Sequence, residues 1–198
     1  MQNTIQQVKD GKDKSETYAK CIIKYNKAIK YGFYFEAIMI DYAMLEDRLL
    51  SFLHHIGVVT RTHKNITINK FCRDEIRELM NYKPNSNMHI DKISTKREII
   101  EKLLLMDAIE SSKYLSVVDM HISKSIDKQT FLETLDEISK WCDIRNQYVH
   151  AMLNKNYIAL QEGLCEYAER GFILVRKVDN FVKAIKLGNS IRRKFKIQ

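Results

Sequence analysis

Little in this sequence interrupts a helix, since it contains one proline and six glycines among 198 residues. These two residue types are the strongest local breakers of regular structure, so their scarcity favours long helices over a β fold with many turns. No window approaches 18 uninterrupted apolar residues, and the N-terminal stretch has no apolar core of the signal-peptide type. We therefore expect no membrane span, no secretion and a cytoplasmic location.

The motifs of several common binding sites are also missing. The chain has no GxxxxGK[ST] or GxGxxG loop to hold phosphates and no HExxH helix to hold zinc. His54 and His55 are adjacent, and adjacent side chains on a helix point about 100° apart, which favours ordinary surface histidines over a metal site. The cysteines form no CxxC pair, which indicates reduced thiols that pack as small apolar side chains. They are Cys21, Cys72, Cys142 and Cys165. We expect no metal and no other cofactor.

Positive charge is in excess, with a formal net charge of +8 at pH 7. Such an excess is consistent with a polyanionic partner, although it does not identify one. The C-terminal end is the most basic part, because no acidic residue follows Lys183. Within the tail the candidate RNA-binding cations are Arg192, Arg193, Lys194 and Lys196. They suit a phosphate backbone, and a solvated charged terminus explains them equally well.

Apolar residues at helical spacing predict six helices and no convincing strand pair. The expected helices cover residues 16–30, 33–56, 69–82, 95–118, 129–153 and 157–187. The second has the clearest pattern, with apolar side chains that recur at alternating spacings of four and three residues, as in helical bundles. We predict an all-α, up-and-down helical bundle. Its expected parts are a polar lead-in (1–15), one helical domain (16–190) and a basic tail (191–198).

The stretch WCDIRNQYVHAML, residues 141–153, places an arginine, an amide and a histidine close together on one predicted helix. Its apolar stripe has Arg145 in the place of an aliphatic residue, and a buried charge must be paired or open onto a polar cleft. In the helix 33–56, Glu46 interrupts an apolar row in the same way. We therefore predict that the two helices pack side by side and that Arg145 forms an ion pair with Glu46.

Asn146 and His150 complete this candidate site. Imidazole is the side chain most easily tuned to exchange protons near neutral pH. Asn146 and His150 are four residues apart and share one face of the helix. Arg145 and His150 point about 140° apart on an ideal helix. They can act on one phosphate only through the reach of the arginine, a local bend, or the contribution of two chains.

The segment RNQYVH, from Arg145 to His150, resembles the Arg-x4-His motif of the HEPN superfamily. The segment YAMLEDRLLSFL, residues 42–53, resembles the first core helix of several HEPN families. The likeness covers residues 30–185, so the first predicted helix and the basic tail are additions to it. It implies a HEPN-like bundle that forms a homodimer, in which the motifs of two chains line one cleft and RNA is the partner.

The activity that this resemblance implies is that of a metal-independent endoribonuclease of toxin or phage-defence type, with an antitoxin or defence-system partner. Arg145 would bind the scissile phosphate, and His150 would act as general acid or base. Asn146 would orient the histidine or hold the phosphate, and Glu46 would support Arg145. Attack by the 2′-hydroxyl of the RNA would leave a 2′,3′-cyclic phosphate.

Two other interpretations stay open at this point. The first is a catalytically silent HEPN-like module that binds RNA or a protein through the same cleft. The second is a helical adaptor in which the pair of Arg145 and Glu46 only holds the bundle together. Tyr148 also has two readings, because it either stacks on a base or packs against the protein.

Overall fold

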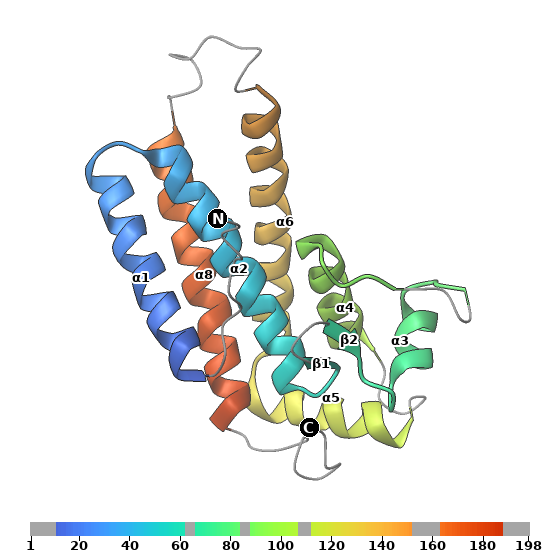
Figure 1. Ribbon diagram of the computed structural model, residues 1–198. Coiled ribbons are helices and arrows are strands. Elements are labelled where there is room, and N and C mark those ends of the chain that lie inside the picture. The colour runs from blue at the N-terminus through green and yellow to red at the C-terminus, as the bar shows by residue number, and fades with distance from the viewer. Residues whose placement is uncertain (1–10, 62–65, 84–87, 107–111, 152–162, 188–198) are drawn as a thin grey trace, which may run out of the picture.

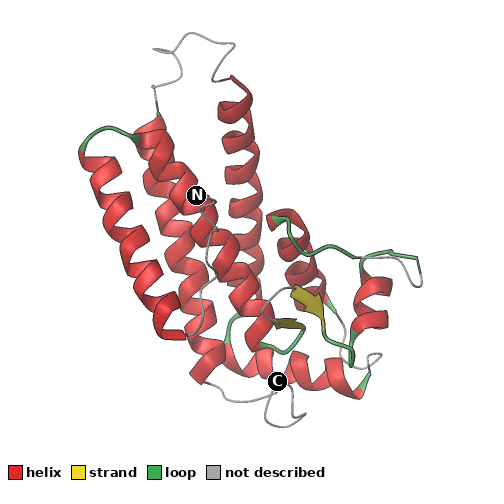
Figure 2. Ribbon diagram, in the orientation of Figure 1, coloured by secondary structure: helices red, strands yellow, loops and turns green. Residues whose placement is uncertain are grey.

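The computed structural model describes residues 11–61, 66–83, 88–106, 112–151 and 163–187. Their regular elements are α1 (Gly11–Lys30), α2 (Tyr34–His55), β1 (Val59–Arg61), β2 (Ile66–Ile68), α3 (Arg73–Leu79), α4 (Ile93–Leu105), α5 (Lys113–Ser125), α6 (Lys128–Ala151) and α8 (Leu164–Leu187). Helices dominate the described residues, and strands make only one short hairpin (Figure 2). The prediction of an all-α fold is confirmed. Within the described residues no helix is both long enough and apolar enough to cross a membrane.

Four long helices, α1, α2, α6 and α8, lie side by side, and in chain order they run alternately up and down (Figure 1). The short helices and the hairpin gather beside the lower half of this bundle. Aromatic packing joins the central helices, because the ring of Phe131 on α6 lies 4.9 Å from Phe52 on α2 and 4.2 Å from Phe181 on α8. The two helices that were predicted to be in contact, α2 and α6, therefore do meet. The main packing partner of α2, however, is α8.

Four elements differ from the prediction. The expected helix 69–82 is shorter, because α3 covers only Arg73–Leu79. The expected helix 95–118 is two helices, because Met106 has an extended backbone (ψ 137°) and the Ser112 hydroxyl caps a new helix by accepting from the Leu115 N–H. The connector after α2 contains the hairpin, whose three-residue strands are too short to show an alternating pattern. Helix α1 begins at Gly11, so part of the expected polar lead-in is helical.

A close approach of helices holds the centre of the bundle. A Cβ at Gly171 on α8 would lie 2.6 Å from Trp141 Cζ2 on α6 and 2.8 Å from Asp41 Oδ2 on α2. Neither distance is compatible with an alanine unless the neighbours move. Glycine at this position therefore allows α8 to pack closely against both α2 and α6. The close contact also positions Trp141, four residues before Arg145.

Candidate functional site

Helix α6 carries the predicted motif past the end of its buried stripe. Asp127 caps the start of the helix, where its carboxylate accepts a hydrogen bond from the Thr130 N–H at 2.6 Å. The last fully buried side chain that the structure describes on α6 is Trp141, and the side chains from Cys142 to His150 are half-buried or exposed. The motif therefore lies at the edge of the core, where a ligand has access to it.

An aromatic cluster attaches this part of α6 to α8. The indole of Trp141 stacks on the ring of Tyr167 with centroids 5.2 Å apart, and its Nε1–H donates to the Tyr167 carbonyl at 3.0 Å. In return the Tyr167 hydroxyl donates to the Trp141 carbonyl, and burial raises the pKa of this phenol. Tyr148 packs on the same ring at 5.5 Å. Of the two roles considered for Tyr148, the structure shows the packing role.

Arg145 lies flat on an aromatic side chain of α2. Its guanidinium carbon is 4.2 Å from the centroid of the Tyr42 ring, a typical cation–π geometry. Nη1 donates to Asn146 Oδ1 at 3.0 Å, and Nη2 lies 3.7 Å from the sulfur of Met39. Among the described residues no carboxylate forms an ion pair with this guanidinium, and its buried Nε has no hydrogen-bond partner there. Tyr42 and Asn146 therefore fix the orientation of Arg145 without neutralising its charge.

Glu46 has a different partner from the predicted one. Its carboxylate accepts a hydrogen bond from Lys96 Nζ on α4 at 2.7 Å, and the same ammonium donates to the Asp91 carbonyl at 2.7 Å. The Lys96 side chain is only 2% exposed, so its charge requires these two oxygens. The predicted pairing of Glu46 with Arg145 is replaced in the structure. Tyr42 and Met39, nearer the start of α2, occupy the position opposite Arg145.

We expect Glu46→Ala to destabilise the protein by about 1–3 kcal/mol, because it leaves the buried ammonium of Lys96 with one oxygen partner. The value lies below that of a fully buried pair because the Glu46 side chain is 35% exposed. Glu46→Gln should cost less, since its amide oxygen can still accept from Lys96. Urea denaturation measures both. Glu98→Ala, at an exposed position on α4, is the matched control. Equal losses for Glu46→Ala and Glu98→Ala would contradict the assigned role.

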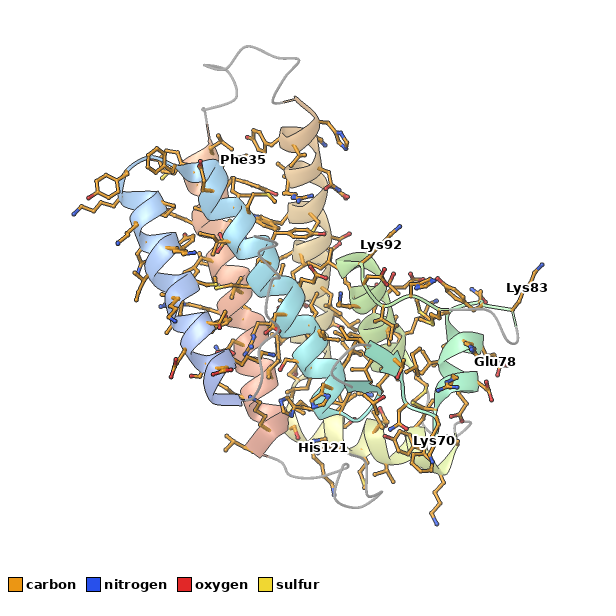
Figure 3. All side chains as sticks on the ribbon, in the orientation of Figure 1. Phe35, Lys70, Glu78, Lys83, Lys92 and His121 are labelled. Carbon is orange, nitrogen blue, oxygen red and sulfur yellow. The ribbon has the colours of Figure 1, made fainter. Side chains whose placement is uncertain are left out.

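A cleft of about 250 Å³ opens beside the motif, between α2, α4 and α6. Tyr42, Asn146 and Arg97 contribute to its walls, and Lys92 lies at its rim. Lys92 is exposed and points outward from the start of α4 (Figure 3). Arg97 is held by Glu101 at 3.1 Å. The cleft thus has basic groups at the start of α4 and one acidic group, Asp143, on α6. It also shares Tyr42 and Asn146 with the surroundings of Arg145.

Cys142 also lines this cleft, and burial disfavours its thiolate form. Burial raises the pKa of its thiol to about 11, and the nearby guanidiniums of Arg145 and Arg97 offset this only in part. A thiol in this state is a poor nucleophile. Across the ranges that the structure describes, no group of three or more His, Cys, Asp or Glu side chains is arranged to hold a metal ion.

His150 lies one helical turn beyond Asn146, on the exposed end of the described part of α6. The structure thus brings Arg145 and Asn146 into direct contact and leaves His150 on the adjoining solvent-facing turn. The tail residues Arg192, Arg193, Lys194 and Lys196 lie outside the described residues.

Comparisons with family models, with curated proteins and with solved structures gave no match. The assignment of a function therefore depends on the residues and geometry described above.

The sequence analysis does not predict the contact of Tyr42 with Arg145, nor the position of Arg97 in the neighbouring cleft. In the sequence, Tyr42 falls on the apolar stripe of the helix 33–56, between Ile38 and Leu45. Arg97 falls in a segment where charged and apolar residues are mixed, as in most surface helices. A signal for Tyr42 was nevertheless present, because an aromatic ring opposite an unpaired arginine is a common alternative to a carboxylate.

Proposed function

We propose that this protein is a metal-independent endoribonuclease of HEPN type. It acts as a homodimer in which Arg145, Asn146 and His150 of two chains line one cleft. The observation that carries the proposal is the state of Arg145, which is oriented by Tyr42 and Asn146 but has no ion-pair partner among the described residues. An oriented guanidinium that is not neutralised is suited to bind a phosphate through two parallel hydrogen bonds.

The proposed reaction is an internal transesterification of RNA. The 2′-hydroxyl oxygen forms a bond to phosphorus and gives its proton to a neutral His150 imidazole. The bond from phosphorus to the 5′-oxygen breaks, and that oxygen takes a proton from the protonated His150 of the second chain. Arg145 stabilises the charge that develops on the non-bridging oxygens. The products carry a 2′,3′-cyclic phosphate and a 5′-hydroxyl.

The angle between the motif side chains supports a site made by two chains. Arg145 and His150 of one helix point about 140° apart, so one chain presents only part of the set to a single phosphate. A second α6 supplies the rest. From the resemblance of the motif we also propose the biological role of a toxin or anti-phage effector, held in check by an antitoxin or another partner of the same defence system.

The experiment that tests this function is cleavage of single-stranded RNA in EDTA, with analysis of the product ends. We expect cyclic phosphates and 5′-hydroxyls. A strand with a single 2′-deoxy sugar at the cleavage position should resist cleavage there, because it lacks the attacking hydroxyl. Products with 5′-phosphates that form only with magnesium would contradict the mechanism. Binding of RNA without cleavage would indicate the silent binding module instead.

A further inference from the structure

The outer face of α1 is strongly basic. From Thr17 to Phe35 the sequence has no acidic residue. Four exposed lysines follow one another along the helix, Lys20, Lys24, Lys27 and Lys30. The first three have the spacing i, i+4, i+7, so they lie in a row on one side of the helix. None of the four forms an ion pair with a carboxylate of the described residues.

The opposite face of α1 is anchored to the bundle, which fixes the direction of this row. Tyr25 stacks on Phe172 of α8 with ring centroids 4.4 Å apart, and its hydroxyl donates to the Ala168 carbonyl at 3.4 Å. The guanidinium of Arg48 on α2 lies over the ring of Tyr18 at 4.6 Å. Because these contacts hold the apolar face inward, the lysine row is presented to solvent.

Two aromatic side chains continue the row at the turn between α1 and α2. Tyr31 is 64% exposed and Phe33 is 57% exposed, with ring centroids 6.5 Å apart. Gly32, at φ +75°, allows the tight turn between them. Lys30 Nζ lies 5.6 Å from the Tyr31 ring. Large rings this exposed contribute little to the core, and they are accessible to a flat ligand.

This turn lies at the same end of the bundle as the end of α6 (Figure 1). A strand laid along the lysine row would therefore lead toward the end that carries His150. The rise from Lys20 to Lys24 is about 6 Å along the axis, which suits neighbouring phosphates of an extended strand.

We propose that the outer face of α1 and the α1–α2 turn form a binding surface for single-stranded RNA. The choice of RNA as the ligand rests on the proposed function. Lys20, Lys24 and Lys27 bind successive phosphates, and Tyr31 with Phe33 receives an unstacked base. A single strand fits better than a duplex, because the bases of a duplex are not free to stack on protein rings. It also fits better than a membrane surface, because the lysine face has no continuous apolar stripe to insert.

The test is binding of a fluorescein-labelled 2′-O-methyl RNA 12-mer, which the protein cannot cleave, followed by fluorescence anisotropy at several salt concentrations. The double variant Lys24→Gln/Lys27→Gln should raise Kd roughly 10-fold and reduce the salt slope by about 1.4, the change expected for two lost phosphate contacts on a single strand. Tyr31→Ala should raise Kd roughly 5-fold or more and leave the slope unchanged. The matched control Lys113→Gln/Lys124→Gln, at exposed positions on α5, should change neither value.

An unchanged Kd in both test variants would contradict the proposed surface. An equal loss of RNA affinity in the Lys113→Gln/Lys124→Gln control would also contradict it. The same would follow if only binding to vesicles with anionic lipids depended on these residues. The outcome is separable from the proposed activity. If the wild type cleaves RNA while these variants bind it normally, the proposed binding surface is wrong and the proposed ribonuclease activity is supported. If the variants bind RNA poorly and the wild type does not cleave it, the binding surface is supported and the ribonuclease activity is wrong.

Discussion

The variant His150→Ala is expected to cleave RNA about 10²–10⁴-fold more slowly than the wild type, which is the usual contribution of a general acid or base. Its stability should hardly change, because the side chain is exposed at the end of the described part of α6. Single-turnover cleavage measures the rate, and urea denaturation checks the fold. Gln147→Ala is the matched control, since it removes another exposed polar side chain from the same turn. A normal rate for His150→Ala would remove the histidine from the mechanism.

The same cleavage assay can show whether Arg145 contributes only its charge or also the planar shape of its guanidinium. Arg145→Lys keeps a cation but loses the planar fork and most of the stacking on Tyr42, so it should recover little of the activity that Arg145→Ala loses. Because the structure shows no carboxylate paired with this arginine among the described residues, neither substitution should destabilise the protein strongly. The cation–π contact alone accounts for about 0.5–2 kcal/mol. Full activity of Arg145→Lys would show that only the charge matters.

The elements that the sequence predicts best are the long helices with many periodic residues. The pattern over 33–56 marks α2 to within about a residue at each end, since 22 residues provide many repeats of the spacing. The hairpin and the break after Leu105 escape prediction for the opposite reason, because three-residue strands and one extended residue leave almost no periodic signal. The sequence predicts that Arg145 faces the helix 33–56, whereas its contact with Tyr42 can be found only in the packed bundle.

Buried charges show the limit of such reasoning most clearly. Glu46 stands out in the sequence because it interrupts an apolar row, but its partner, Lys96, has the pattern of an ordinary solvent-exposed lysine. Another acid of α2, Asp41, lies on the buried stripe itself, three residues after Ile38 and four before Leu45, and the sequence analysis does not predict its burial. Periodicity shows which face a residue is on, but the degree of its burial depends on which helix covers that face.

Asp41 is fully buried, and neither of its carboxylate oxygens has a hydrogen-bond partner among the described residues. It lies where Gly171 of α8 makes its close approach, next to the indole of Trp141. Burial disfavours the charged form, and it raises the pKa of this carboxyl to about 8 from an ordinary value near 3.8. At neutral pH the side chain is therefore mostly protonated in the folded protein and ionised in the unfolded chain.

This difference makes the stability of the wild type depend on pH. Below about pH 4 both states hold the proton, and the contribution of Asp41 is fully present. Between about pH 4 and pH 8 only the folded state holds it, so stability falls as pH rises, by about 1.4 kcal/mol for each pH unit. Above about pH 8 both states are ionised, and the loss is complete.

Asp41→Asn should remove this dependence, because the amide has nearly the same shape and stays neutral. We expect the two proteins to have similar free energies of unfolding near pH 4. The variant should become the more stable one as pH rises, by about 3 kcal/mol or more at pH 7. Urea denaturation at intervals from pH 4.5 to pH 8 measures the difference. Because the six histidines are common to both proteins, their titration cancels in the comparison.

Asp136→Asn is the matched control, since Asp136 lies exposed on α6 in a surface ion pair with Lys140. Its stability curve should run nearly parallel to that of the wild type. The prediction for Asp41 depends on the shape of the curve and not on one value, because a poor fit of the amide would shift the whole curve by a constant amount. If the curves of Asp41→Asn and the wild type were parallel from pH 4.5 to pH 8, Asp41 would not be a neutral acid buried between α2, α6 and α8.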